Sequence, residues 1–193
     1  MHKNSCNLVV YKLFSFFFCL FEQYLDKLKC LDLRNSKDLI QTPNLIGVPI
    51  LARLYLSWCG NLVEIHPSVG QLCILIILEL EHCHSLTNLP RMTTRMESLT
   101  TLSLCGCSKI RKIPEFEGIL KSLSKLNLSE TAIEELPSSI ECLTALTLLD
   151  LRNCENLYYL PSNMSSLKSL EKLVLSGCLQ LANLPENIWE INC

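Results

Sequence analysis

The residues best suited to chemistry in this sequence are its cysteines and histidines. The chain of 193 residues contains 12 cysteines and 4 histidines. The run His82-Cys83-His84 has the close spacing of metal ligands, and Cys105 and Cys107 place two thiols near one another. Irregularly spaced, so many cysteines in a secreted chain would suggest a disulfide framework. Whether these groups can act together depends on the elements that position them.

The cysteines belong to a sequence motif that recurs along the chain. The pattern L-x-x-L-x-L-x-x-C, or a close variant, recurs every 23 or 24 residues, beginning at Leu28, Leu51, Leu75, Leu99, Leu123, Leu146 and Leu170. A fixed period of this length is the signature of leucine-rich repeats, in which each unit supplies a short strand and a helix or 3₁₀ turn. We therefore predict an α/β fold, a leucine-rich repeat solenoid. It forms a curved horseshoe with a parallel sheet on the concave face and short helices or 3₁₀ turns on the convex face.

The leucine spacing explains why the units must stack. Leucines at the fourth and sixth positions of a unit share one face of a strand, and the residues between them share the other face. One unit alone cannot bury its leucines, so the next strand pairs beside it at about 4.8 Å. The bulkier segments on the outer side need roughly 8 to 10 Å. This unequal spacing bends the stack, with the sheet on the inside of the curve.

The ninth position of each unit holds a small residue. There the chain turns inward, and a buried thiol can pack as a small apolar group while its S–H reaches a backbone carbonyl. Serine or threonine can take the same place. The seven residues are Ser36, Cys59, Cys83, Cys107, Thr131, Cys154 and Cys178. We interpret the five cysteines as a structural ladder rather than as disulfide partners or metal ligands.

This placement separates the candidate metal ligands from one another. Cys83 enters the ladder while His82 and His84 lie outside it, and Cys105 and Cys107 are divided in the same way, so we predict no metal site. No serine, histidine and carboxylate set falls on one short arc, and no carboxylate pair stands in a recognisable pocket. We predict no catalytic residues, no cofactor and no enzymatic activity.

Each unit closes on a proline. Proline extends the residue before it and can open a helical turn, so the residues after it are expected to form the convex side. The closing pairs are Leu89-Pro90, Ile113-Pro114, Leu136-Pro137, Leu160-Pro161 and Leu184-Pro185.

The charge balance excludes two classes of partner. With 17 basic and 19 acidic residues the formal net charge is −2. This gives no electrostatic footprint for nucleic acid or an anionic membrane. We expect neither partner.

The two ends of the sequence are less regular. The apolar run at residues 13–21 is too short to span a bilayer and lacks a small-residue cleavage pattern after it, although a signal segment stays an alternative. We prefer a degenerate first repeat, with Leu8, Tyr11 and Leu13 at the first, fourth and sixth positions. The predicted division is an N-terminal flank at 1–27 and a domain of seven repeats at 28–193. The chain stops without a polar cap, so we expect it to be part of a longer protein.

The repeat phrases resemble a known family. Stretches such as LSLCGCSKIRKIPEFEG and LNLSETAIEELPSSIECLTALTLLDLRNCENLYYLPSNMSSLKSLEKLVLSGC are similar to the leucine-rich repeat region of plant intracellular disease-resistance receptors of the TIR, nucleotide-binding, leucine-rich repeat type. The similarity covers roughly residues 22–190. It implies a cytoplasmic immune sensor whose repeats recognise a pathogen effector or a guarded host protein and restrain a nucleotide-binding module. Neither a phosphate loop of the G-x-x-x-x-G-K-[ST] type nor a TIR portion occurs here. The resemblance therefore implies only the recognition role of the repeat region for this sequence.

Recognition is expected on the concave face, at the third, fifth, seventh and eighth positions of each unit. The first candidate is an aromatic group of Tyr55, Trp58 and His82, because exposed aromatics near charges are common interface anchors. The alternative is an ordinary solvated sheet surface. A second candidate is the set of charged residues Arg53, Glu79, Glu81, Lys125, Glu130, Asp150, Arg152 and Lys172. Cross-strand pairing and solubility are the alternative for this set.

Three other functions stay open at this point. An extracellular repeat receptor or enzyme inhibitor is one, although such repeats usually resemble L-x-x-N-x-L-x-G-x-I-P, and here the asparagine is replaced by cysteine and that glycine is missing. A substrate adaptor of a ubiquitin ligase is another, although its units are longer. The third is a truncated product without independent function.

Overall fold

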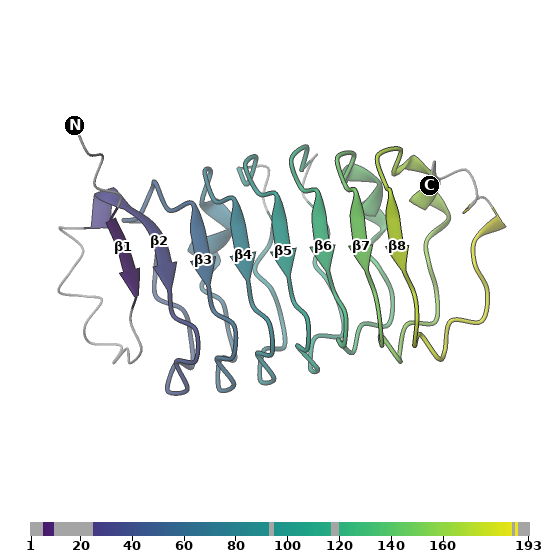
Figure 1. Cartoon of the computed structure of the whole chain (residues 1–193), viewed down its shortest axis with the longest axis horizontal. Helices are drawn as coiled ribbons and strands as arrows, with labels where there is room; N and C mark the ends of the chain where they lie inside the picture. Colours follow the sequence, from purple (N-terminus) through teal and green to yellow (C-terminus); the bar gives the residue numbers. More distant parts are fainter. Residues whose placement is uncertain (1–5, 10–24, 93–94, 117–119, 187, 189–193) are drawn as a thin grey trace.

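The computed structural model describes residues 6–9, 25–92, 95–116, 120–186 and 188. Eight strands form one parallel sheet in sequence order, and Figure 1 shows them side by side along an elongated stack. The strands are β1 Cys6–Val9, β2 Leu28–Asp32, β3 Arg53–Tyr55, β4 Ile77–Glu79, β5 Thr101–Ser103, β6 Lys125–Asn127, β7 Leu148–Asp150 and β8 Lys172–Val174.

From β2 to β8 the strands pair position for position. Leu31 lies opposite Leu54, and the fourth-position leucines continue in this way to Leu149 and Leu173. The third and fifth positions pair with their own kind in the same manner. The predicted parallel sheet and the repeat register are therefore confirmed.

The register of β1 differs from the prediction. Leu8 pairs with Leu31, at the fourth position of the next unit, and a register shift falls between Cys6 and Asn7. The prediction had placed Leu8 at the first position, which would align it with Leu28. A run of apolar residues offers several similar registers, so its pattern fixes the pairing weakly. Tyr11 and Leu13 lie outside the described residues, and the division at residue 27 stays a prediction.

Short 3₁₀ helices lie behind the sheet in Figure 1, namely η3 Pro67–Gln71, η4 Ser138–Cys142 and η5 Ser162–Ser166. A further one, η2 Leu25–Lys27, leads directly into β2. Pro67 is the first residue of η3, while Pro137 and Pro161 cap η4 and η5 in an extended conformation. The expectation that proline opens the outer segment is confirmed at these three units.

The leucine ladder forms one continuous core between the sheet and the outer segments. The first-position leucines from Leu28 to Leu170 are at most 1% exposed. Burying such a side chain contributes about 1.5–3 kcal/mol. In the last strand, Leu173 and Leu175 are only partly buried and pack on the edge of the core.

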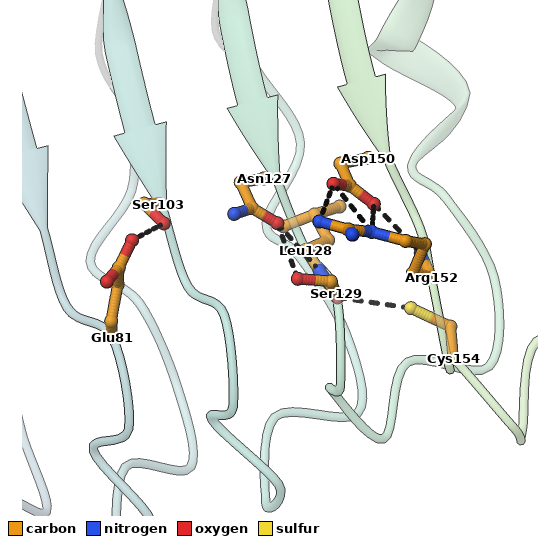
Figure 2. Close-up of polar contacts among 8 residues, drawn as sticks. All are labelled: Glu81, Ser103, Asn127, Leu128, Ser129, Asp150, Arg152 and Cys154. Atoms are coloured by element: carbon orange, nitrogen blue, oxygen red, sulfur yellow. Dashed lines mark hydrogen bonds and ion pairs between the residues drawn. The ribbon is translucent and has the colours of Figure 1, made fainter. Parts of the chain in front are cut away.

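The ninth-position thiols donate to the backbone as predicted. Each cysteine of the ladder reaches the carbonyl of the sixth-position leucine in the preceding unit, for example from Cys59 Sγ to Leu33 O at 3.1 Å and from Cys107 Sγ to Leu80 O at 2.9 Å. Thr131 differs, because its shorter hydroxyl donates to Leu128 O of its own unit at 2.7 Å. The Cys154 thiol donates to that same carbonyl (Figure 2). The ladder therefore ties neighbouring units together.

Candidate recognition face

The sheet face is defined here as the side chains at the third, fifth, seventh and eighth positions of units Leu28 to Leu170. The strands supply the third and fifth positions, and the turn that follows each strand supplies the others. Since neighbouring units pair in register, each position forms a column across the face. All the predicted binding residues fall in these four columns.

The eighth column has an unusual backbone. Every residue in it has a positive φ, namely Asn35, Trp58, His82, Gly106, Glu130, Asn153 and Gly177. The N–H groups of those from Asn35 to Asn153 donate along the stack, as from Trp58 N to Glu81 O at 2.7 Å. Glycine and asparagine tolerate this left-handed region, whereas a bulky side chain there is an outlier. The two glycines and two asparagines in the column were the signal that sequence reasoning missed.

Trp58 and His82 meet as predicted from their column. Their rings stack with centroids 4.0 Å apart and an interplanar angle of 25°, while Trp58 remains 52% exposed. Gly106 makes room for this stack, because a Cβ there would lie 2.3 Å from Nδ1 of His82. Tyr55 lies under the Arg34 guanidinium, which is 5.2 Å from the ring centroid. Gly106 and Arg34 thus join the aromatic group that the sequence indicated.

Part of the charged set is paired within single repeat units. Arg152 binds the Asp150 carboxylate through Nε and Nη2, with an Nη2–Oδ2 distance of 2.7 Å (Figure 2). Arg34 binds Asp32 in the same way. The Arg34 hydrogen bonds lower the pKa of Asp32 against the opposing effect of burial. Cross-strand pairing, the alternative for the charged set, is wrong for Asp150 and Arg152, because both belong to one repeat unit, with Asp150 at the end of β7 and Arg152 in the turn that follows.

The remaining predicted residues lie apart from such pairs. Arg53, Lys125 and Lys172 lie in the third-position column, as the first residues of β3, β6 and β8. No ion pair joins these three to any residue that the structure describes. Glu130 lies in the eighth column, with its backbone N–H bonded to Arg152 O at 2.8 Å.

An acidic depression of about 390 Å³ opens where β2, β3 and β4 end. Its lining includes Asp32, Arg34, Ser57, Trp58, Glu79 and Glu81. Burial raises the pKa of Glu79, and the negative charge of Glu81 raises it further. Sequence reasoning placed Glu79 and Glu81 on this face, and the structure brings them together beside Trp58.

A serine–histidine contact outside the sheet face has a structural explanation. His66 Nδ1 lies 2.9 Å from Ser68 Oγ at the start of η3. Ser68 is 1% exposed, and its Oγ also accepts a hydrogen bond from Leu45 N at 2.8 Å. The pair caps a turn and ties two units together. Within the described ranges, no group of three or more histidine, cysteine or acidic side chains could hold a metal ion.

The part of the chain that the structure describes includes no helix with the length and apolar character needed to cross a membrane.

Comparison with known proteins agrees with this architecture. The family model described as "Leucine-rich repeat region" matches residues 56–190. TMV resistance protein N of Nicotiana glutinosa is 40% identical over 88% of this chain, which spans 15% of that protein. Disease resistance protein RPS6 of Arabidopsis thaliana is also 40% identical, over 79% of this chain and 11% of its own length.

Solved structures show the same fold. A leucine-rich repeat protein of Leptospira interrogans superposes with a TM-score of 0.70 and 27% identity, over 89% of this chain and 42% of that one. The leucine-rich repeat domain of the type III effector XopL gives 0.59 and 24%, over 90% and 76%, and supports the fold alone. The predicted resemblance to the repeat region of plant disease-resistance proteins is confirmed. The chain belongs to the leucine-rich repeat family, and relatives that are 40% identical to it over 88% and 79% of its length are plant disease-resistance proteins.

Proposed function

We propose that this chain is a non-catalytic protein-recognition module of plant defence. It binds a pathogen effector or a guarded host protein in the cytoplasm and, within a longer polypeptide, restrains a nucleotide-binding module. The names of its relatives support the role in disease resistance, although the chain spans only 15% and 11% of two of them. The nine cysteines from Cys30 to Cys178 are free thiols, as is usual in a reducing compartment.

Trp58 is the observation that carries the proposal. Trp58 is 52% exposed, so it is not part of the hydrophobic core. Its φ of 67° is a backbone conformation that does not favour a bulky side chain. The equivalent positions Asn35 and Asn153 show that a residue better suited to the turn serves there. Local strain retained at an exposed aromatic is a common property of binding sites.

The other predicted residues are assigned to the same surface. His82 stacks on Trp58, Glu79 and Glu81 line the depression beside it, and these residues form the core of the proposed interface with Tyr55 of the same unit. The residues toward the two sides of the face form its polar rim, and these are Arg53, Lys125, Glu130, Asp150, Arg152 and Lys172. The Asp150–Arg152 pair is expected to act by shape, because its charges already satisfy one another.

A pull-down from leaf extract tests this function. The full chain is compared with the double variant Tyr55→Ala, Trp58→Ala. The control variant is Ile40→Ala, Ile46→Ala, which removes two apolar side chains that are 64% and 65% exposed outside the sheet face. We expect the sheet-face variant to lose at least one specifically bound protein that the control retains. Equal recovery of every bound protein by both variants would contradict the proposal.

A further inference from the structure

The acidic depression has a charge that its own residues do not balance. Arg34 lies in the lining, but its guanidinium is engaged by Asp32 at distances of 2.5 to 3.1 Å. The Glu79 carboxylate has no hydrogen bond or ion pair with any described residue, and only its backbone carbonyl accepts a hydrogen bond, from Leu56 N at 2.8 Å. Glu81 accepts a hydrogen bond from Ser103 Oγ at 2.7 Å (Figure 2), and no described cation pairs with it. The nearby Arg53 does not line the depression.

Ser57 supplies a second and independent observation. It lines the depression, is 4% exposed, and its buried Oγ has no hydrogen-bond partner. The equivalent Ser129 donates to Asn127 Oδ1 at 2.7 Å (Figure 2), but Tyr55 replaces that asparagine beside Ser57. An unsatisfied buried hydroxyl is costly, at about 1–3 kcal/mol. Its lone pairs are available to a donor that enters the depression.

Trp58 adds an aromatic wall. His82 stacks on one side of the indole, and the depression is lined by Trp58 together with Asn35 and Arg34, which come from the unit on the other side. An indole is the best aromatic partner for a cation held against its face. The site therefore combines two carboxylates and a buried hydroxyl, none of them ion-paired or bonded to a cation among the described residues, with an aromatic surface.

We propose that this depression binds an arginine side chain presented by a protein partner. The guanidinium lies against Trp58 and donates to the carboxylates of Glu79 and Glu81 and to Ser57 Oγ. Arginine fits better than lysine, because its planar group carries five donors and no acceptor, stacks on aromatic rings and is more weakly hydrated. This inference rests on the proposed function, since it names the chemistry that the same face recognises.

Peptide binding to the full chain tests the proposal. The probes are fluorescein-labelled nonapeptides of glycine and serine with a central arginine, lysine, citrulline or glutamate, followed by fluorescence anisotropy at low salt. Citrulline keeps the shape of arginine but has no charge. We expect the arginine peptide to bind roughly tenfold more tightly than the citrulline peptide and several-fold more tightly than the lysine peptide. The glutamate peptide is expected not to bind.

A matched pair of variants locates the site. Glu79→Gln, Glu81→Gln removes two negative charges inside the depression, and Glu97→Gln, Glu141→Gln removes two exposed charges outside the sheet face. We expect the first variant to weaken arginine binding roughly tenfold and the second to leave it unchanged. Equal binding of the arginine and citrulline peptides, or equal loss in both variants, would overturn the proposal. If the leaf-extract pull-down depends on Tyr55 and Trp58 but the arginine peptide does not bind, the proposed recognition face is supported and only the proposal of arginine binding is contradicted.

Discussion

Trp58 occupies a backbone conformation that its own side chain disfavours. In the eighth column the left-handed region is accessible to glycine and asparagine, and a bulky residue there costs about 1–3 kcal/mol. The stacking of Trp58 on His82 stabilises the fold by about 0.5–1.5 kcal/mol. Because these effects nearly offset one another, the tryptophan contributes little net stability. Selection for contact with another molecule explains its presence better than selection for folding.

This balance predicts that Trp58→Asn is tolerated by the fold. We expect the free energy of unfolding to change by less than about 1 kcal/mol, because the lost stack is offset by relief of strain. Urea denaturation followed by circular dichroism measures it. As a control, Leu56→Asn places an amide in the buried core two residues earlier and should destabilise the chain much more. A loss above about 2 kcal/mol for Trp58→Asn would show that the tryptophan is structural.

The ladder thiols make stability sensitive to alkaline pH. Burial raises the pKa of Cys59 from 9.0 to about 12 and that of Cys154 to about 11. These thiols therefore ionise at lower pH in the unfolded chain than in the folded chain. Their contribution to the free energy of unfolding is fully present below pH 9 and is lost as the pH rises toward 11 or 12. The slope is about 1.4 kcal/mol per pH unit for each titrating thiol.

Urea midpoints between pH 8 and 10.5 test the effect of Cys59. Lysine and tyrosine residues titrate in both proteins, so the difference between the native chain and Cys59→Ser isolates the thiol. The serine variant should show the shallower decline above pH 9. Identical slopes would mean that Cys59 ionises in the folded chain as it does in the unfolded one.

At the scale of the repeat unit, the leucine pattern predicted most of what the structure contains. Strand position, register and the core followed from spacing alone, because one residue of slip would turn every leucine to the wrong face. The left-handed eighth column did not follow, because Trp58 and Glu130 conceal the preference that Asn35 and Gly106 reveal. The Asp150–Arg152 pair could not be predicted from spacing, because each residue could equally pair with a neighbouring unit or, as in the structure, within its own unit. The unsatisfied hydroxyl of Ser57 depends on side-chain geometry that no spacing encodes.

Equivalent leucines in an inner and an outer unit should differ in their contribution. Leu126 and Leu173 share the fourth position, but Leu126 is 1% exposed between two units while Leu173 is only partly buried. We expect Leu126→Ala to cost about 2–5 kcal/mol in the free energy of unfolding and Leu173→Ala about 1 kcal/mol, since less apolar surface is lost from the core. Urea denaturation of the two variants makes the comparison. Equal losses would contradict a core built unit by unit.

At the scale of the whole molecule, the stacking of short repeat units produces a long continuous surface. Each strand from β2 to β7 contacts one neighbour on either side, so the sheet face extends without requiring a closed pocket (Figure 1). Such a surface can change its recognition residues at the third, fifth, seventh and eighth positions while the leucines preserve the fold. The part of the face at β3 and β4 holds the aromatic stack and the acidic depression. A protein partner seated there is the central claim.

Site-specific photo-crosslinking in leaf tissue tests that claim most directly. The photoreactive residue p-benzoylphenylalanine is incorporated in place of Trp58 in one protein and in place of the exposed Ile46, outside the sheet face, in another. We predict that irradiation links a specific protein to position 58 and none to position 46. Crosslinking at position 46 without crosslinking at position 58 would contradict recognition through the sheet face.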